Sequence, residues 1–212
     1  MHPNGASTFQ RAQFFFGPTM FAGAISGNIT NIYFYASGSS GASAVYYNFK
    51  VSLGTSTVDS LNTASWYSTG MVQCINSSSF TISGLGTGVW IKIPLTNPFY
   101  YENSKNLIID IQSTGSSGFF YINQNTLTYS PGRVYGTVSI PSSSDAITPD
   151  FGIDLVPTYN DAGVLSIDSP YSVCLGSSNI FKTTIKNYGH NQINSVTVKW
   201  YFSITNLLYF NT

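Results

Sequence analysis

The chain has 212 residues, of which 42% are apolar and 16% aromatic, so it can form a sizeable hydrophobic core. Only 8% are charged, and 8 basic residues balance 8 acidic ones, which leaves no electrostatic field to attract nucleic acid or to hold the chain on an anionic membrane. This composition favours neutral partners, such as glycans or other proteins.

Residues that suit pleated sheets dominate the sequence. Val, Ile, Tyr, Phe, Thr and Trp are frequent, whereas Glu102 is the only glutamate and Arg11 and Arg133 are the only arginines. No apolar run is long enough to span a membrane. The sequence therefore predicts an all-β protein, with an antiparallel jelly-roll-like β-sandwich followed by a partial immunoglobulin-like sandwich.

The first half of the chain alternates between strands and polar turns. Residues 1–8 should form a loose N-terminus, and strands are expected over 11–16 and 29–35, before a Gly/Ser loop. The clearest alternation follows over 45–53. It places Val45, Tyr47, Phe49, Val51 and Leu53 on one face, so we expect Tyr47, Phe49 and Val51 to be core residues.

Two strong strands then organise the centre of the sequence. After short strands near 71–75 and 80–82 and a Gly-rich turn, residues 89–93 and 107–111 each alternate at period two. Ile91, Ile109 and Ile111 should face the core, and Asp110 should face solvent. Because proline cannot donate to a ladder, Pro94 and Pro98 predict that residues 94–105 leave the sheet as a corner or long loop.

The later strands complete one domain and open a second. Strands expected over 119–122, 133–140 and 151–156 close a sandwich over residues 9–157, and residues 158–160 should be a linker. Residues 161–212 predict a partial immunoglobulin-like domain, in which strands near 181–185 and 196–202 form a hairpin with Trp200 facing inward.

Residues 161–212 offer three or four strands, whereas an immunoglobulin-like sandwich needs about seven over about 100 residues. The faces that carry Ile185, Val198, Trp200 and Phe202 would then lie open. Two explanations remain: the remaining strands are missing from this chain, or another chain supplies strands by β-augmentation and the protein is a polymer unit.

Three segments carry a resemblance to a known type of protein: RAQFFF with AGAISGNITNIYFY, VWIKIPLTNPFYYENSKNLIIDIQ, and DAGVLSIDSPYSVCLG followed by KTTIKNYGHNQINSVTVKW. They resemble the β-sandwich module that precedes immunoglobulin-like (CARDB-like) repeats in secreted and cell-surface proteins of Bacteroidetes. The resemblance implies an extracellular or cell-surface location, in type IX-secreted adhesins, filaments or hydrolases. It carries no catalytic residues. The N-terminus lacks the features of a signal peptide, so we expect a mature or partial product.

The same resemblance implies modification of one serine. Asp59-Ser60-Leu61 is similar to the short Asp-Ser/Thr-apolar sequence at which such secreted proteins accept O-glycans, so Ser60 is the expected acceptor. A bulky sugar in this polar loop would also help to keep a surface of low charge in solution.

The sequence contains no recognisable catalytic constellation. His2 and His190 lie in a loose terminus and a turn, without an evident second ligand or nucleophile. Glu102 and Asp110 could form the carboxylate pair of a glycoside hydrolase, but a polar loop and an outward strand position predict ordinary surface roles. Cys74 and Cys174 are expected not to form a mutual disulfide. We expect the chain not to be an enzyme.

Two binding sites are candidates. Asp145, Asp150 and Asp154 are close enough in sequence to suggest a Ca²⁺ site, although the last two would need a bend to converge. Exposed aromatic rings stack on the C–H faces of sugars, and the candidates for this role are Trp90, Tyr100, Tyr101, Tyr121 and Tyr129. The alternative for both sets is ordinary strand and turn structure.

The sequence thus predicts a non-enzymatic extracellular module, structural or adhesive, that works without a cofactor unless Ca²⁺ binds. Its expected partners are other surface proteins or further copies of itself, joined through the partial C-terminal domain, and possible glycans. The alternative is a carbohydrate-binding accessory domain of a secreted hydrolase.

Overall fold

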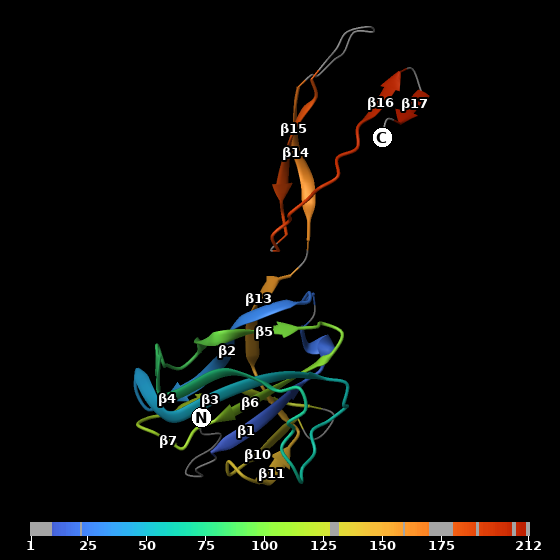
Figure 1. Cartoon of the computed structure of the whole chain (residues 1–212). Coiled ribbons are helices and arrows are strands. Elements are labelled where there is room, and N and C mark those ends of the chain that lie inside the picture. Colours follow the sequence, from blue (N-terminus) through green and yellow to red (C-terminus); the bar gives the residue numbers. More distant parts are fainter. Residues whose placement is uncertain are drawn as a thin grey trace. The chain divides into compact units, whose positions relative to one another are not determined.

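The computed structural model describes residues 10–21, 23–127, 132–158, 160–169, 180–189, 191–204 and 207–210 (Figure 1). The chain divides into two compact units, Met1–Pro157 and Thr158–Thr212. Within the described ranges the only helical element is one 3-10 turn, η1 (Pro18–Phe21), so none of them holds a helix that could span a membrane. The expected all-β class is confirmed.

The first unit contains two larger antiparallel sheets. One has seven strands in the order β11-β10-β1-β6-β3-β4, with β7 pairing with β3; the other has the order β13-β2-β5, with β8 pairing with β2. The strands of the first sheet are β1 (Arg11–Phe16), β3 (Ser43–Ser56), β4 (Val72–Ser83), β6 (Asn106–Gln112), β7 (Gly115–Ser116), β10 (Arg133–Gly136) and β11 (Pro141–Asp145). Those of the second are β2 (Gly27–Ser39), β5 (Val89–Tyr101), β8 (Phe120–Ile122) and β13 (Phe151–Pro157). A short pair, β9 (Gln124–Thr126) and β12 (Ile147–Pro149), stands apart.

The inner faces of the two sheets share one hydrophobic cluster. Phe14 and Ile109 enter it from the first sheet, and Ile32, Phe34 and Ile91 enter it from the second. Each buried side chain of this size contributes roughly 1.5–3 kcal/mol relative to exposure, so this layer is the main source of stability of a sandwich-like unit.

Strand β6 is buried on both faces. Leu107, Ile109 and Ile111 point into the main cluster, while Ile108 packs with Phe15, Leu61 and Val134 in a second, smaller cluster. Residues 57–71 contribute Leu61, Trp66, Tyr67 and Met71 to this cluster and so cover the outer face of the sheet. The expectation that Asp110 faces solvent is therefore wrong, because its side chain is 2% exposed beneath this segment.

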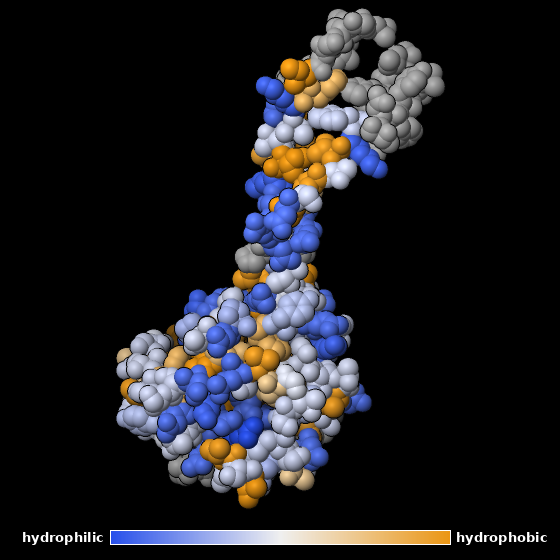
Figure 2. All heavy atoms as spheres, in the orientation of Figure 1, coloured by the Kyte–Doolittle hydropathy of each residue, from blue (hydrophilic) through white to orange (hydrophobic). Residues whose placement is uncertain are grey.

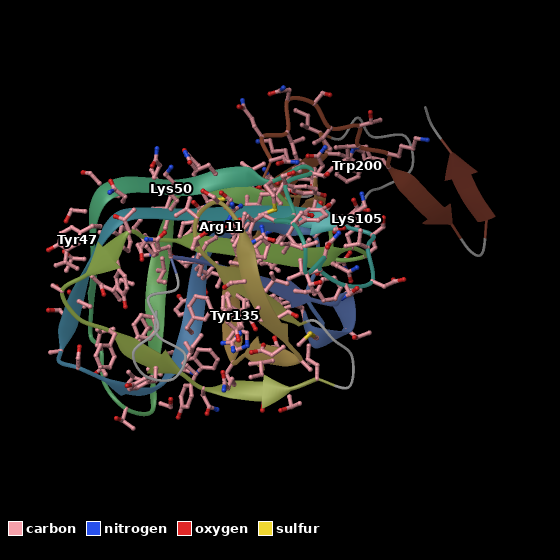
Figure 3. The ribbon with its side chains drawn as sticks, turned by 90° about the horizontal axis from the view of Figure 1, so that it is seen from below. Arg11, Tyr47, Lys50, Lys105, Tyr135 and Trp200 are labelled. Carbon is pink, nitrogen blue, oxygen red and sulfur yellow. The ribbon has the colours of Figure 1, made fainter. Side chains whose placement is uncertain are left out.

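Strand β3 changes the face that it presents to the core at Asn48. Ala44 and Tyr46 are buried before this residue, and Phe49, Val51 and Leu53 are buried after it. Asn48 has a φ of +49°, a left-handed conformation that Asn tolerates better than most residues, and this reverses the alternation. The prediction of Tyr47 as a core residue is wrong: its side chain is 46% exposed and points outward (Figure 3).

Strand β5 continues through its prolines. Pro94 pairs with Asn31, pairing resumes at Phe99 with Ile29, and residues 95–98 bulge out between the two. The strand accepts proline because it is the edge of its sheet, where a missing N–H breaks no ladder. The predicted departure from the sheet is thus limited to this bulge, and the strand ends only at Tyr101.

The described residues of the second unit form two small two-stranded sheets. Strand β14 (Ala162–Ser169) pairs with β15 (Lys182–Asn187), and β16 (Tyr201–Ile204) pairs with β17 (Leu207–Phe210). The predicted hairpin between 181–185 and 196–202 is wrong, because β15 pairs with β14 and residues 191–200 are not in a strand. Figure 2 shows hydrophobic side chains at the surface of this unit, where Val164, Leu165, Ile167 and Ile180 are all more than half exposed.

Candidate functional site

The structure separates the five aromatic residues predicted to bind sugar. Trp90 and Tyr100 are 53% and 52% exposed on β5, and Tyr121 is half-buried on β8. Trp90 pairs with Tyr35 and Tyr100 pairs with Asn28, seven positions away along β2, so the two are roughly 23 Å apart at about 3.3 Å per residue. They do not line one groove. Tyr129 lies outside the described residues.

Tyr101 is a core residue with no exposed surface, so the prediction that it binds sugar is wrong. Phe99 and Tyr101 keep the period-two alternation that buries Ile91 and Ile93, and both face inward beyond the bulge at residues 95–98. The Tyr101 hydroxyl donates to the carbonyl of Lys105 at 3.2 Å, and its ring meets the edge of Phe21 at a centroid distance of 5.8 Å. Burial raises the pKa of this phenol.

The outer face of the four-stranded sheet brings together side chains that the sequence analysis did not group. Tyr33 and Tyr35 alternate with the buried Ile32 and Phe34, so both phenols lie on the side away from the core. Tyr33 pairs with Lys92 across β2 and β5, and Tyr35 pairs with Trp90. We call Tyr33, Tyr35, Trp90, Lys92 and Asp154 the Trp90 face.

Trp90 reaches across the sheet toward β13. A Cβ placed on Gly152 would lie 3.7 Å from Cζ3 of the indole and 3.4 Å from Cβ of Tyr33. The indole also packs on Tyr35, with ring centroids 5.2 Å apart and planes at 60°. One edge of the ring thus lies close to the backbone of β13 at Gly152, while more than half of the side chain remains in solvent.

A polar cluster borders these rings. Asp154 accepts hydrogen bonds at Oδ2 from Nδ2 of Asn31 at 2.8 Å and from the Tyr33 hydroxyl at 2.7 Å. Lys92 Nζ lies 3.9 Å from the same oxygen and 5.8 Å from the centroid of the Tyr33 ring. The hydrogen bond to Asp154 is the main cause that raises the pKa of Tyr33, and desolvation adds to it.

The three aspartates predicted to bind Ca²⁺ do not converge. Asp145 forms a salt bridge with Arg133, Asp150 accepts from Asn123 and Asn125, and Asp154 belongs to the cluster above. The part of the chain that the structure describes contains no group of three or more His, Cys, Asp or Glu side chains that could hold a metal ion. The prediction of a shared site for these three residues is therefore wrong, because each carboxylate has its own partner on a different strand.

The carboxylates considered for glycoside hydrolysis are also engaged. Glu102 is half-exposed and lies 2.8 Å from Lys105 Nζ; hydrogen bonds from Lys105 and Ser104 lower its pKa, opposite to the direction that a general acid needs. Asp110 lies on another strand, under the segment 57–71. His2 and His190 lie outside the described residues, as does Cys174, while Cys74 is buried with a free thiol.

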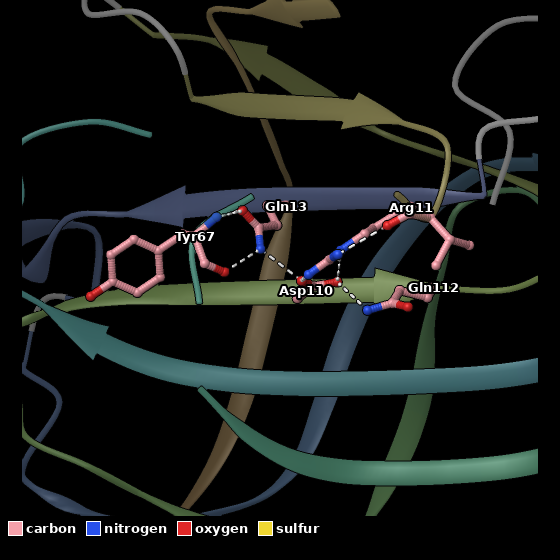
Figure 4. A network of polar contacts seen from close by, with 6 residues as sticks. Arg11, Gln13, Tyr67, Asp110 and Gln112 are labelled. Atoms are coloured by element: carbon pink, nitrogen blue, oxygen red, sulfur yellow. Dashed lines mark hydrogen bonds and ion pairs between the residues drawn. The ribbon is translucent and has the colours of Figure 1, made fainter. Parts of the chain in front are cut away.

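Asp110 is the centre of a buried polar network (Figure 4). Arg11 donates to it through Nε at 2.9 Å and Nη2 at 2.5 Å, and Gln13 donates to it through Nε2 at 2.7 Å. The Gln13 amide also binds both backbone groups of Tyr67, donating to its carbonyl at 2.8 Å and accepting from its N–H at 2.9 Å. Arg11 packs over the Trp66 ring at 4.6 Å. The network ties β1 and β6 to the segment 57–71.

Ser60 lies in that segment. Asp59 and Ser60 are exposed, whereas Leu61 is buried in the second cluster and anchors the residues before it. The Ser60 hydroxyl therefore lies at the surface, and the buried Leu61 anchors the backbone next to it.

Comparisons of this chain with protein-family models, with curated proteins and with solved structures found no match. Tyr33 and Tyr35 could have been found from the sequence, since two tyrosines two apart in a strand whose other face is apolar must share the outer face. Their juxtaposition with Trp90 and Asp154 depends on strand order.

Proposed function

We propose that this chain is a non-enzymatic structural or adhesive module of an extracellular bacterial surface or secreted protein, with filament formation as one form of its assembly. The observation that carries the proposal is that the carboxylates considered for chemistry are engaged with neighbouring side chains instead. Asp110 pairs with Arg11 under the segment 57–71, Asp145 pairs with Arg133, and the pKa of Glu102 is lowered by its neighbours. The module works without a cofactor.

At the level of fold, we propose a jelly-roll-like sandwich followed by a partial immunoglobulin-like, CARDB-like domain of the Bacteroidetes type. Support comes from the path of the chain, which alternates between the two larger sheets: β1 lies in the first, β2 in the second, β3 and β4 in the first, and β5 in the second. Such crossing is typical of jelly rolls.

The partners of the module are other surface proteins or further copies of the chain, bound through the second unit. Val164, Leu165 and Ile167 on β14 are each more than half exposed, and β14 has β15 as its hydrogen-bonded neighbour among the described strands. Exposed apolar side chains on a two-stranded sheet favour the addition of strands from another chain.

The proposed extracellular location includes O-glycosylation of Ser60. The exposed hydroxyl beside the buried Leu61 fits an O-glycan that projects into solvent. The peptide that contains Ser60, isolated from the native organism, should carry a glycan mass, and an unmodified peptide would contradict this part of the proposal.

The alternative is a carbohydrate-binding accessory domain of a secreted hydrolase. The Trp90 face favours it, because an exposed indole beside amide, carboxylate and ammonium groups matches the way in which proteins hold sugars.

A turnover screen separates both binding roles from catalysis. Purified full-length chain should release no product from a panel of neutral and acidic polysaccharides, esters and peptides. Turnover that disappears in an Asp154→Asn or Glu102→Gln variant, but persists in Asp59→Asn, would overturn the proposal.

A further inference from the structure

We infer that the Trp90 face is a binding site for an uncharged sugar chain, with the Trp90 indole as the stacking surface and Asp154 as the main hydroxyl acceptor. The inference rests on the proposed binding function and names its ligand class and residues. It concerns one side of the four-stranded sheet, formed by β2, β5 and β13.

The indole is positioned in advance. One edge of the ring lies over Gly152, where a Cβ would be only 3.7 Å from Cζ3, and Tyr35 supports the ring at a centroid distance of 5.2 Å. The ring is nonetheless 53% exposed, so it offers apolar surface to solvent without having to rearrange. A sugar ring with axial hydrogens on one side can cover such a surface at little cost in conformational entropy.

The polar groups beside the indole are also held in place. Asn31, Tyr33 and Lys92 all reach Oδ2 of Asp154, and none of these three contacts uses Oδ1. The Asp154 side chain is 47% exposed, so Oδ1 can accept from a sugar hydroxyl, and the Lys92 ammonium can donate to a ring or hydroxyl oxygen. A fixed acceptor and donor beside a stacking ring give orientation as well as affinity.

The charge of the Trp90 face determines which class of glycan it can bind. Lys92 and Asp154 offset each other on this face, and the whole chain carries a formal net charge of +0. A polyanion would gain no attraction here and would meet the Asp154 carboxylate. The face is thus complementary to neutral chains rather than to acidic polysaccharides, nucleic acid or anionic lipid.

The test uses the full-length chain and soluble neutral oligosaccharides: the hexamers of cellulose, xylan, mannan and chitin. Binding is measured by calorimetry, and heparin and alginate fragments serve as acidic probes. At least one neutral hexamer should bind, and Trp90→Ala should weaken that binding by about tenfold or more. Asp154→Asn should weaken it less, because the amide keeps an acceptor oxygen.

Tyr100→Ala is the matched control, since Tyr100 is an equally exposed aromatic residue of the same strand but lies far from Trp90. It should leave affinity unchanged, and the melting temperature of each variant checks that it folds. No binding to any neutral hexamer, preference for an acidic probe, or an equal loss in Tyr100→Ala would overturn the site. Binding of a protein, but of no sugar, to the Trp90 face would also overturn the site. Cleavage of a bound hexamer would leave the site standing and instead overturn the non-enzymatic function.

Discussion

At the scale of single residues, the most unusual group in the core is the Tyr46 hydroxyl. The side chain is 2% exposed and its oxygen makes no hydrogen bond of ordinary geometry within the described chain. Burial raises the pKa of Tyr46 to about 12, although the nearby backbone of Phe120 lowers it slightly. Burial likewise raises the pKa of Cys74 to about 11. Both side chains are stable in the core only while neutral.

These pKa values predict a loss of stability at alkaline pH. The folded-state pKa of Tyr46 lies above the unfolded value of 10, so its contribution is complete below about pH 10 and is lost as the pH rises toward 12. Between about pH 9 and about pH 11.5, the wild type should lose roughly 2 kcal/mol more than Tyr46→Phe, which keeps the ring but cannot ionise. Urea denaturation at the two pH values measures the difference.

Tyr47→Phe is the control, because the neighbouring Tyr47 is exposed. It should follow the wild type at both pH values. If Tyr46→Phe lost as much stability as the wild type, Tyr46 would not be the buried titrating group.

At the scale of elements, the segment 57–71 works as a cover that an ion pair holds on the first sheet. Arg11 and Gln13 of β1 and Asp110 of β6 are neighbours in the ladder, and Gln13 fixes the backbone of Tyr67. A buried charge without its partner is costly, because the desolvation cost remains after the attraction is gone.

Asp110→Ala should therefore destabilise the first unit by about 3 kcal/mol and expose the segment 57–71 to proteases. Urea denaturation and limited proteolysis measure the two effects. Lys105→Ala removes an exposed ion pair with Glu102 and should leave both unchanged. Similar losses in the two variants would show that the network does not hold the cover.

At the scale of the whole molecule, stability belongs to the first unit. Both hydrophobic clusters consist of residues between Ala12 and Leu155, and neither includes any of the side chains that the structure describes in the second unit. The described side chains of the second unit include several apolar ones that are more than half exposed.

A chain that ends after Thr158 should therefore melt at the same temperature as the first transition of the full-length protein. Full-length protein should also self-associate with rising concentration, and Leu165→Ser with Ile167→Ser should reduce this association, as sedimentation measures. A large drop in the melting temperature of the shorter chain, or residues 158–212 folding alone as a closed monomeric sandwich, would contradict this division.

The sequence by itself determined the class of the fold and much of its core. Period-two alternation places Phe49, Val51, Ile91, Ile109 and Ile111 inside, and all five are buried. The pattern succeeds because alternation is a local property of any strand, whatever the strand pairs with.

Tertiary structure decided what lies against each face. One left-handed residue, Asn48, moves Tyr47 out and Tyr46 in. Tyr101 lies in the core because β5 resumes its pairing with β2 after the bulge at residues 95–98 instead of leaving the sheet. Asp110 is buried only because a distant loop covers its strand. The Trp90 face likewise exists because β2, with its two tyrosines, lies between β5 and β13. Alternation shows that a strand has two faces, but burial and binding depend on segments far away in the sequence, and only the packed chain brings them together.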